Sequence, residues 1–237
     1  MVTSNTVNDE NLYTKYASSW PIPPGTTLLG PFEIPSRGDH DSPLFLSAVT
    51  AADLPEIIRV LNINKDIFYN TGSFQYPYLE SHAVTRMDNV HKWRLEFGFN
   101  NRWAMRTSPD GPLVGWIHCF PVPNIPFIHP LEPHRHVKII ELGYWVSPEF
   151  RNRGFGSRSA RFVVEEIGFK VLHGDIVRAR AYVENMGSRK VLEAAGMRCE
   201  LASKREFVDK LQKEMDLAFY AVHRDPSTHH ILHDGTV

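Results

Sequence analysis

The segment from Glu141 to Ser157 constrains the fold most strongly. It begins as an apolar, strand-like run that stops at a Ser-Pro pair, continues as a short basic loop with two glycines, and ends where a helical pattern starts. Glycines let backbone N–H groups close around an anion, and a helix N-terminus carries about half a positive charge. The side chains of Arg151 and Arg153 add to that potential. The segment therefore predicts an anion-binding loop at the start of a helix.

Composition narrows the class of protein. The 237 residues are 42% hydrophobic and 22% charged, as expected for one large globular domain. The net charge of -1 provides no polycation to attract nucleic acid. Only Cys119 and Cys199 are present, which favours a reducing compartment. No apolar run reaches the length of about 18 residues that a transmembrane helix needs, and the polar start is no signal peptide. We expect a cytoplasmic protein without a membrane segment.

Three regions follow from the distribution of proline, glycine and apolar residues. Residues 1–43 are expected to form an extended, Pro-rich arm that packs on the domain, because their prolines exclude a long helix. Residues 44–224 are expected to form the folded domain, and residues 225–237 a flexible tail.

Hydrophobic periodicity divides the domain into strands and helices. Strands are expected over residues 44–49, 102–106, 113–120, 137–146, 176–183, 199–207 and 215–223, and helices over 54–61, 79–97, 157–170 and 185–195. The aromatic-rich segment 68–76 either lines a pocket or packs in the core. The segment 121–136, rich in proline and histidine, is expected to be an inserted loop. No metal site is expected, because no cysteine or paired carboxylate accompanies its histidines in ligand-like spacing.

The order of these elements, together with three motifs, resembles the GNAT superfamily of acyl-CoA-dependent N-acyltransferases, and within it the RimJ/RimL-like branch. Arg151, Gly154 and Gly156 fit the [QR]-x-x-G-x-[GA] signature of that family. The preceding sequence ELGYWVSPE is similar to the same strand in that branch, and NMGSRKVLEAAGM is similar to the helix that follows the next strand. The resemblance covers residues 44–223. It implies an α/β (α+β) fold whose central sheet is mixed, mostly antiparallel, flanked by helices and splayed at the coenzyme site.

The same resemblance implies acetyl-CoA as co-substrate. Its pyrophosphate would be held by the loop residues, namely Arg151, Asn152, Arg153, Gly154, Phe155, Gly156 and Ser157. Trp145 and Val146 would pair with the pantetheine arm, and the Val146 N–H would polarise the thioester carbonyl. Asn185 would hydrogen-bond the pantetheine.

Two residues are candidates for catalysis by the same resemblance. Glu141 matches a position used as general base; alternatively, it is an ordinary polar strand residue that faces outward. The family's usual acid, a tyrosine, is replaced here by Leu192. Ser188 matches a serine given that role in the RimL-like branch; alternatively, it only contacts the coenzyme or packs.

The expected activity is acetyl transfer to a primary amine by direct attack on the thioester. The acceptor is either a protein N-terminus or a small amine, and the protein is either a monomer or a homodimer, with no nucleic-acid or membrane partner. A non-catalytic module that binds acyl-CoA is the alternative, favoured only by Leu192. A P-loop fits the sequence poorly, because Ser-Arg, not Lys-Ser/Thr, follows the second glycine.

Overall fold

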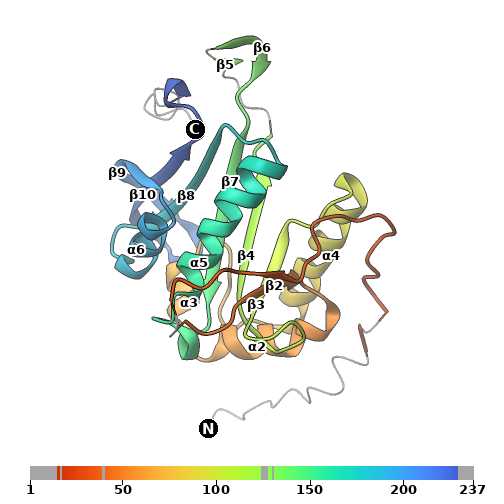
Figure 1. Ribbon diagram of the computed structural model, residues 1–237. Helices are drawn as coiled ribbons and strands as arrows, with labels where there is room; N and C mark the ends of the chain where they lie inside the picture. The colour runs from red at the N-terminus through yellow and green to blue at the C-terminus, as the bar shows by residue number, and fades with distance from the viewer. Residues whose placement is uncertain (1–14, 17, 39–40, 124–127, 130, 229–237) are drawn as a thin grey trace.

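An eight-stranded sheet runs through the centre of the molecule (Figure 1). The computed structural model describes residues 15, 16, 18–38, 41–123, 128, 129 and 131–228. The strands of this sheet are β1 (Phe32–Glu33), β2 (Phe45–Ala48), β3 (Arg102–Arg106), β4 (Leu113–Pro121), β7 (Ile139–Val146), β8 (Ile176–Tyr182), β9 (Arg198–Val208) and β10 (Lys213–His223). They lie in the order β1-β2-β3-β4-β7-β8-β10-β9.

The sheet opens between β7 and β8. These two strands are parallel, whereas all other neighbours in the sheet are antiparallel. Pairing between β7 and β8 covers only three residues of each strand, from Ile139 opposite Ile176 to Glu141 opposite Arg178. Beyond Glu141 the two strands diverge. The predicted mixed, mostly antiparallel and splayed sheet is therefore confirmed.

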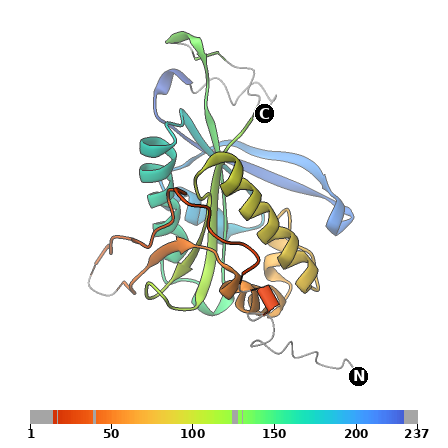
Figure 2. The same ribbon diagram turned by 90° about the vertical axis from the view of Figure 1, so that its right-hand side faces the viewer.

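Helices cover both faces of the sheet. They are α2 (Leu54–Asn62), α3 (Asp66–Asn70), α4 (Glu80–Phe97), α5 (Phe155–Phe162) and α6 (Met186–Ala194), and α5 continues as a π-helix over Val163–Val171. One hydrophobic core lies between the sheet and α5, and a second lies between the sheet and the pair α2 and α4. Figure 2 shows α5, in teal, and α4, in olive, on opposite sides of the sheet.

Two segments contain regular structure that the sequence pattern did not predict. The segment 121–136, expected to be a loop, contains a small hairpin of β5 (Ile128–His129) and β6 (Glu132–His136), which projects beyond the end of the main sheet (Figure 1). The sequence pattern missed this hairpin because its prolines and histidines interrupt the alternation of apolar and polar residues that indicates a strand. The helix α3 lies in a stretch that has no clear apolar period, and it is only five residues long.

The described part of the arm packs on α4 and extends the sheet. The rings of Tyr16 and Trp20 stack 5.3 Å apart. The Tyr16 hydroxyl donates to Glu80 at 2.8 Å, and the Trp20 indole donates to Asp88 at 2.7 Å. Strand β1 then pairs with β2. Residues 1–14 and 229–237, where the start of the arm and most of the tail were predicted, lie outside the described residues.

None of the helices in the described ranges has both the length and the apolar content needed to cross a bilayer.

Candidate functional site

The loop before α5 presents unpaired backbone donors. Gly154 caps α5 with a φ of 76°, and Asn152 also has a positive φ, 61°. The N–H groups of residues 152–157 donate no hydrogen bond to any residue that the structure describes. Unpaired donors at a helix N-terminus, next to the positive end of the helix dipole, are suited to bind an anion. We call the loop of residues 151–157 the cradle, and it presents such donors.

A cavity of about 390 Å³ lies against this loop. Its walls come from α3, from the end of β7, from the loop and from α6: Ile67, Asn70, Thr71, Tyr144, Trp145, Val146, Phe150, Arg151, Asn152, Gly154, Phe155, Gly156, Ser157, Asn185, Gly187, Ser188, Lys190, Val191 and Ala194. All predicted cofactor-binding residues except Arg153 are among them. The Arg153 guanidinium instead lies over the Phe150 ring, 5.0 Å from its centroid. We call this space the first cavity.

The end of β7 exposes a backbone N–H to the gap between β7 and β8. The Ser147 N–H donates to the Val114 carbonyl on β4 at 2.9 Å. Hydrogen-bonded and non-hydrogen-bonded pairs alternate along an antiparallel ladder, so Val146, opposite Gly115, directs its N–H away from β4. By the same alternation the backbone of Trp145 is bonded to β4. Trp145, which was expected to pair with the pantetheine arm together with Val146, contributes its side chain to the first cavity.

The start of α6 brings Asn185 and Ser188 to the same place. The Asn185 side-chain oxygen accepts a hydrogen bond from the Ser188 N–H at 3.0 Å and so caps the helix. The Ser188 hydroxyl lies 2.8 Å from the hydroxyl of Tyr144, on β7. Leu192 is fully buried in the core between the sheet and α5. Ser188 thus reaches the gap, and Leu192 does not.

A second cavity, of about 800 Å³, adjoins the first cavity. Its walls come from β4, β7, β8, the segment between α3 and α4, and the β9–β10 hairpin. It shares five residues with the first cavity: Asn70, Thr71, Tyr144, Trp145 and Ser188. The two cavities therefore meet at the gap between β7 and β8.

Glu141 lines the second cavity at the apex of the gap. Its carboxylate accepts a hydrogen bond from the Arg178 Nε at 2.7 Å and lies 3.5 Å from the Arg180 Nε. The Glu141 side chain is 15% exposed. Glu141 is therefore not an outward-facing polar residue of the strand; it is an ion-paired carboxylate inside the site.

Two residues of the second cavity were not found from the sequence. Lys210, at the tip of the β9–β10 hairpin, donates to the carbonyl oxygens of Phe68 and Phe74, which precede α4. Desolvation lowers the pKa of Lys210 to about 8. His118 lies against Gly143, and burial lowers its pKa to about 3, so its ring is neutral. Neither residue belongs to a local motif, because the fold alone brings both to the cavity.

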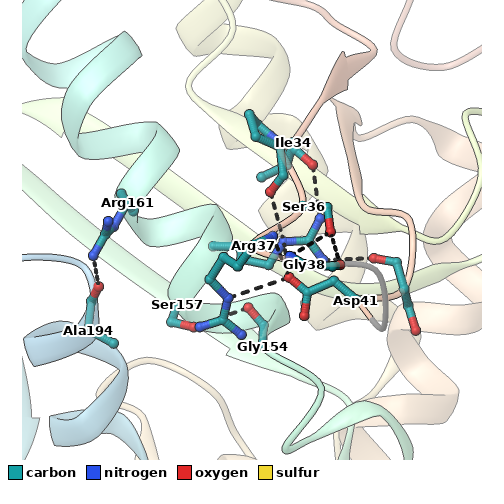
Figure 3. A network of polar contacts seen from close by, with 12 residues as sticks. Ile34, Ser36, Arg37, Gly38, Asp41, Gly154, Ser157, Arg161 and Ala194 are labelled. Carbon is teal, nitrogen blue, oxygen red and sulfur yellow. Dashed lines mark hydrogen bonds and ion pairs between the residues drawn. The ribbon is translucent and has the colours of Figure 1, made fainter.

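Residues of the N-terminal arm contact α5 and the loop that precedes it. Arg158, in the first turns of α5, is 5% exposed and donates to three arm carbonyls. The Arg37 N–H donates to the Asp41 carboxylate at 2.8 Å, and a Cβ at Gly154 would overlap the Arg37 guanidinium. Figure 3 shows Arg37 and Asp41 of the arm close to Gly154 and Ser157. The arm therefore packs against the loop at Gly154.

No metal centre is formed by the parts of the chain that the structure describes: no three His, Cys, Asp or Glu side chains gather there in a ligand-like group.

A family model for the acetyltransferase (GNAT) domain matches residues 44–198. That range contains the cradle, the gap and the three helices that line the first cavity, α3, α5 and α6. No curated protein matches the chain in a sequence search.

Solved acetyltransferases share the fold. A GNAT-family acetyltransferase from Bacillus anthracis is 16% identical with a TM-score of 0.60, over 81% of this chain and 98% of that chain. The microcin self-immunity acetyltransferase MccE, solved with acetyl-CoA and AMP, is 14% identical with a TM-score of 0.56, over 85% and 98%. The ribosomal alpha-N-protein acetyltransferase RimL, solved with coenzyme A, is 14% identical with a TM-score of 0.57, over 81% and 98%. At such identities the likeness concerns the fold alone.

Proposed function

Because the chain belongs to the acetyltransferase (GNAT) domain family, we propose that it is an acetyl-CoA-dependent N-acetyltransferase that acts on a primary amine. The observation that carries this proposal is the meeting of two cavities at the gap between β7 and β8. The first cavity offers a site for an anionic donor, and the second offers a separate space for an acceptor.

The residues of the first cavity fit acetyl-CoA. The unpaired N–H groups of residues 152–157 suit a pyrophosphate, and Arg151 adds a cation beside them. The outward N–H of Val146 is suited to donate to the thioester carbonyl, where it would stabilise the negative charge that develops there. The side-chain NH₂ of Asn185 makes no hydrogen bond to the described residues and remains for the pantetheine. Bound acetyl-CoA supplies the activated acetyl group.

The second cavity offers the acceptor a base. An amine attacks only after it has lost a proton. Glu141 faces this cavity as a carboxylate, and we assign it the role of receiving that proton, directly or through water. Its partner Arg178 keeps the carboxylate in place, since the two side chains lie across the last paired residues of β7 and β8.

Two features bear on the acceptor and favour different classes. The neighbouring RimL is an alpha-N-protein acetyltransferase, which favours a protein N-terminus. The contacts of Lys210 with Phe68 and Phe74 close the β9–β10 hairpin over the second cavity, which favours a small amine. Figure 2 shows this hairpin, in blue, reaching out on the side of the sheet that carries α4. We therefore propose a primary amine as acceptor and test both classes.

Calorimetry with acetyl-CoA tests the donor site. Gly154→Glu and Gly156→Glu should each abolish binding, because each adds a negative charge next to the N–H groups of the cradle, and the new side chain would overlap Arg37 at position 154 and press on Val191 at position 156. Val171→Glu is the matched control, since it adds the same charge at an exposed position at the far end of the same helix. If acetyl-CoA still binds to both glycine variants, the cradle is not its binding site.

Thiol release tests turnover. The protein is offered acetyl-CoA with peptides that have free N-termini and, separately, with small primary amines. Release with either class supports the enzyme and identifies its acceptor class. A folded protein that binds acetyl-CoA but releases no thiol with either class would favour the non-catalytic module.

A further inference from the structure

Arg86, on α4, lines the second cavity and forms no ion pair with any carboxylate that the structure describes. Its guanidinium donates to Ser73, to the carbonyl at 3.3 Å and to the hydroxyl at 3.4 Å, and lies over the Phe74 ring, 4.2 Å from the centroid. The Nε atom of Arg86 is buried and has no hydrogen-bond partner among the described residues. A cation in such a place is costly unless an anion approaches it.

The other arginines of the second cavity already have carboxylate partners. Arg178 donates to the Glu141 carboxylate at 2.7 Å. Arg180 forms ion pairs with Glu141 at 3.5 Å and with Glu206 at 3.9 Å. Within the described ranges, Arg86 is therefore the arginine of this cavity whose charge is left for a ligand.

Two side chains of the sheet make the region around Arg86 more positive. Arg102 and His118 lie opposite each other on β3 and β4, and His118 lies opposite Gly143 on β7, so these positions share one face of the sheet. The His118 ring lies over Gly143, where a Cβ would come within 2.6 Å of it. Desolvation and the charges of Arg102 and Arg86 lower the pKa of His118 to about 3. The neutral ring still has one N–H to donate.

Glu141, the proposed base, lies close to this region on the same face of the sheet. It precedes Gly143 by two residues on β7, and residues two apart in a strand point to the same face and lie about 7 Å apart. The second cavity thus has a carboxylate that can receive a proton and, a short distance away, an arginine without a carboxylate partner. An acceptor that fits both carries an amine and, a few bonds from it, an anionic group.

We propose that Arg86 binds a carboxylate of the acceptor, so that the substrate is an amine with an acidic group within a few bonds of its nitrogen, an inference that rests on the proposed function. A guanidinium suits a carboxylate because two of its N–H groups can donate in parallel to the two oxygens. Two sources offer this chemistry. One is a free amino acid, and the other is a peptide with Asp or Glu next to its free N-terminus.

Matched acceptors with and without the carboxylate test this site in the complete protein. Alanine and β-alanine are compared with their amides, and the amidated peptide Ser-Asp-Phe is compared with Ser-Asn-Phe, in the thiol-release assay. For each pair, kcat/KM of the acid is divided by kcat/KM of the amide, in the wild type and in Arg86→Gln. We expect this ratio to be about tenfold lower in Arg86→Gln, because a charge-assisted pair is lost.

The comparison between proteins removes the chemical differences between the amines. An acid and its amide differ in the basicity of the nitrogen, but that difference is the same with the wild type and with Arg86→Gln, so it cancels when the two ratios are compared. The pair of acceptors whose ratio falls identifies the source, a free amino acid or a peptide.

Lys92→Gln is the matched control. Lys92 is exposed on the same helix and lines neither cavity, so its replacement removes one positive charge from α4 outside the site. The ratios in Lys92→Gln should equal those of the wild type.

Saturation-transfer NMR measures the same preference without turnover. The acids and amides are offered to the protein in the presence of coenzyme A. The wild type and Lys92→Gln should give a stronger signal with the acid than with the amide, and Arg86→Gln should give equal signals.

The outcomes separate this inference from the function on which it rests. A preference for the acid in NMR that is lost in Arg86→Gln, without thiol release from any acceptor, would overturn the proposed function and leave the carboxylate site. Thiol release with equal ratios in the wild type and Arg86→Gln would overturn the carboxylate site alone. If Arg86→Gln does not fold, the wild type decides, since equal NMR signals for acid and amide would overturn the site.

Discussion

Arg158 joins the arm to the cradle through backbone carbonyls. It donates to Ile34 at 2.9 Å, Pro35 at 3.1 Å and Ser42 at 2.7 Å. Arg158→Met would leave these acceptors without their donor in a buried place. Since each unsatisfied buried group is costly, we expect the free energy of unfolding to fall by about 2 to 4 kcal/mol, measured by urea denaturation.

Arg161→Met provides the comparison on the same helix. Arg161 is exposed and donates only to the Ala194 carbonyl, at 2.7 Å. Its replacement should cost less than about 1 kcal/mol. Equal losses for the two variants would show that Arg158 contributes no more than a surface arginine.

Glu141→Gln removes the proposed base and keeps the shape of the side chain. We expect turnover to fall by about a hundredfold or more, which is the usual contribution of a general base. Initial rates measured with the acceptor found in the thiol-release assay give this quantity.

Arg178→Met tests the alternative that Glu141 only holds β7 to β8. It breaks the 2.7 Å ion pair but leaves the carboxylate. If Glu141 is the base, Arg178→Met keeps more of the turnover than Glu141→Gln does. Equal losses of turnover in the two variants would reduce Glu141 to a structural role.

At the scale of elements, the β9–β10 hairpin is held to the segment before α4 by Lys210. Desolvation lowers the pKa of Lys210 from its ordinary 10.5 to about 8. Between these pH values the folded protein has lost the proton and the unfolded chain still carries it, so stability should rise with pH. We expect the free energy of unfolding of the wild type, minus that of Lys210→Met, to increase from about pH 8 upward and to be constant below it.

Lys204→Met serves as the control, because Lys204 lies on the same hairpin with a half-exposed side chain. If the difference in free energy of unfolding between the wild type and Lys210→Met does not change above pH 8, the pKa of Lys210 is not lowered in the folded protein.

The sequence predicted the elements whose signals are local. The strand β7, the cradle and α5 follow one another in a single segment, so apolar runs and glycines were enough to find them. The pairing of Glu141 with Arg178 was missed, because it depends on the register of two strands separated by a helix. The position of Lys210 was missed because it depends on hydrogen bonds to residues far away in the sequence. The β5–β6 hairpin was missed because its strands are short and show no hydrophobic periodicity.

At the scale of the molecule, the first cavity spans both parts of the opened sheet. Its walls include β7 on one side of the gap and α6, which follows β8, on the other. A ligand bound there should therefore stabilise the whole fold. We expect acetyl-CoA at about a hundred times its dissociation constant to add about 2.7 kcal/mol to the free energy of unfolding.

Thermal unfolding with and without acetyl-CoA measures this effect. The midpoint should rise in the wild type and in Val171→Glu, and it should stay unchanged in Gly154→Glu. A rise in Gly154→Glu equal to that of the wild type would show that acetyl-CoA binds elsewhere.

The gap between β7 and β8 also bears on the order in which substrates bind. Apart from their five shared residues, the two cavities have different walls, the loop before α5 and the start of α6 for the first and β4, β8 and the β9–β10 hairpin for the second, so the proposed donor and acceptor each have a space of their own. Neither has to leave before the other arrives. We therefore expect both substrates to be bound together before the acetyl group moves, which gives intersecting lines in double-reciprocal plots and no acetylated form of the protein.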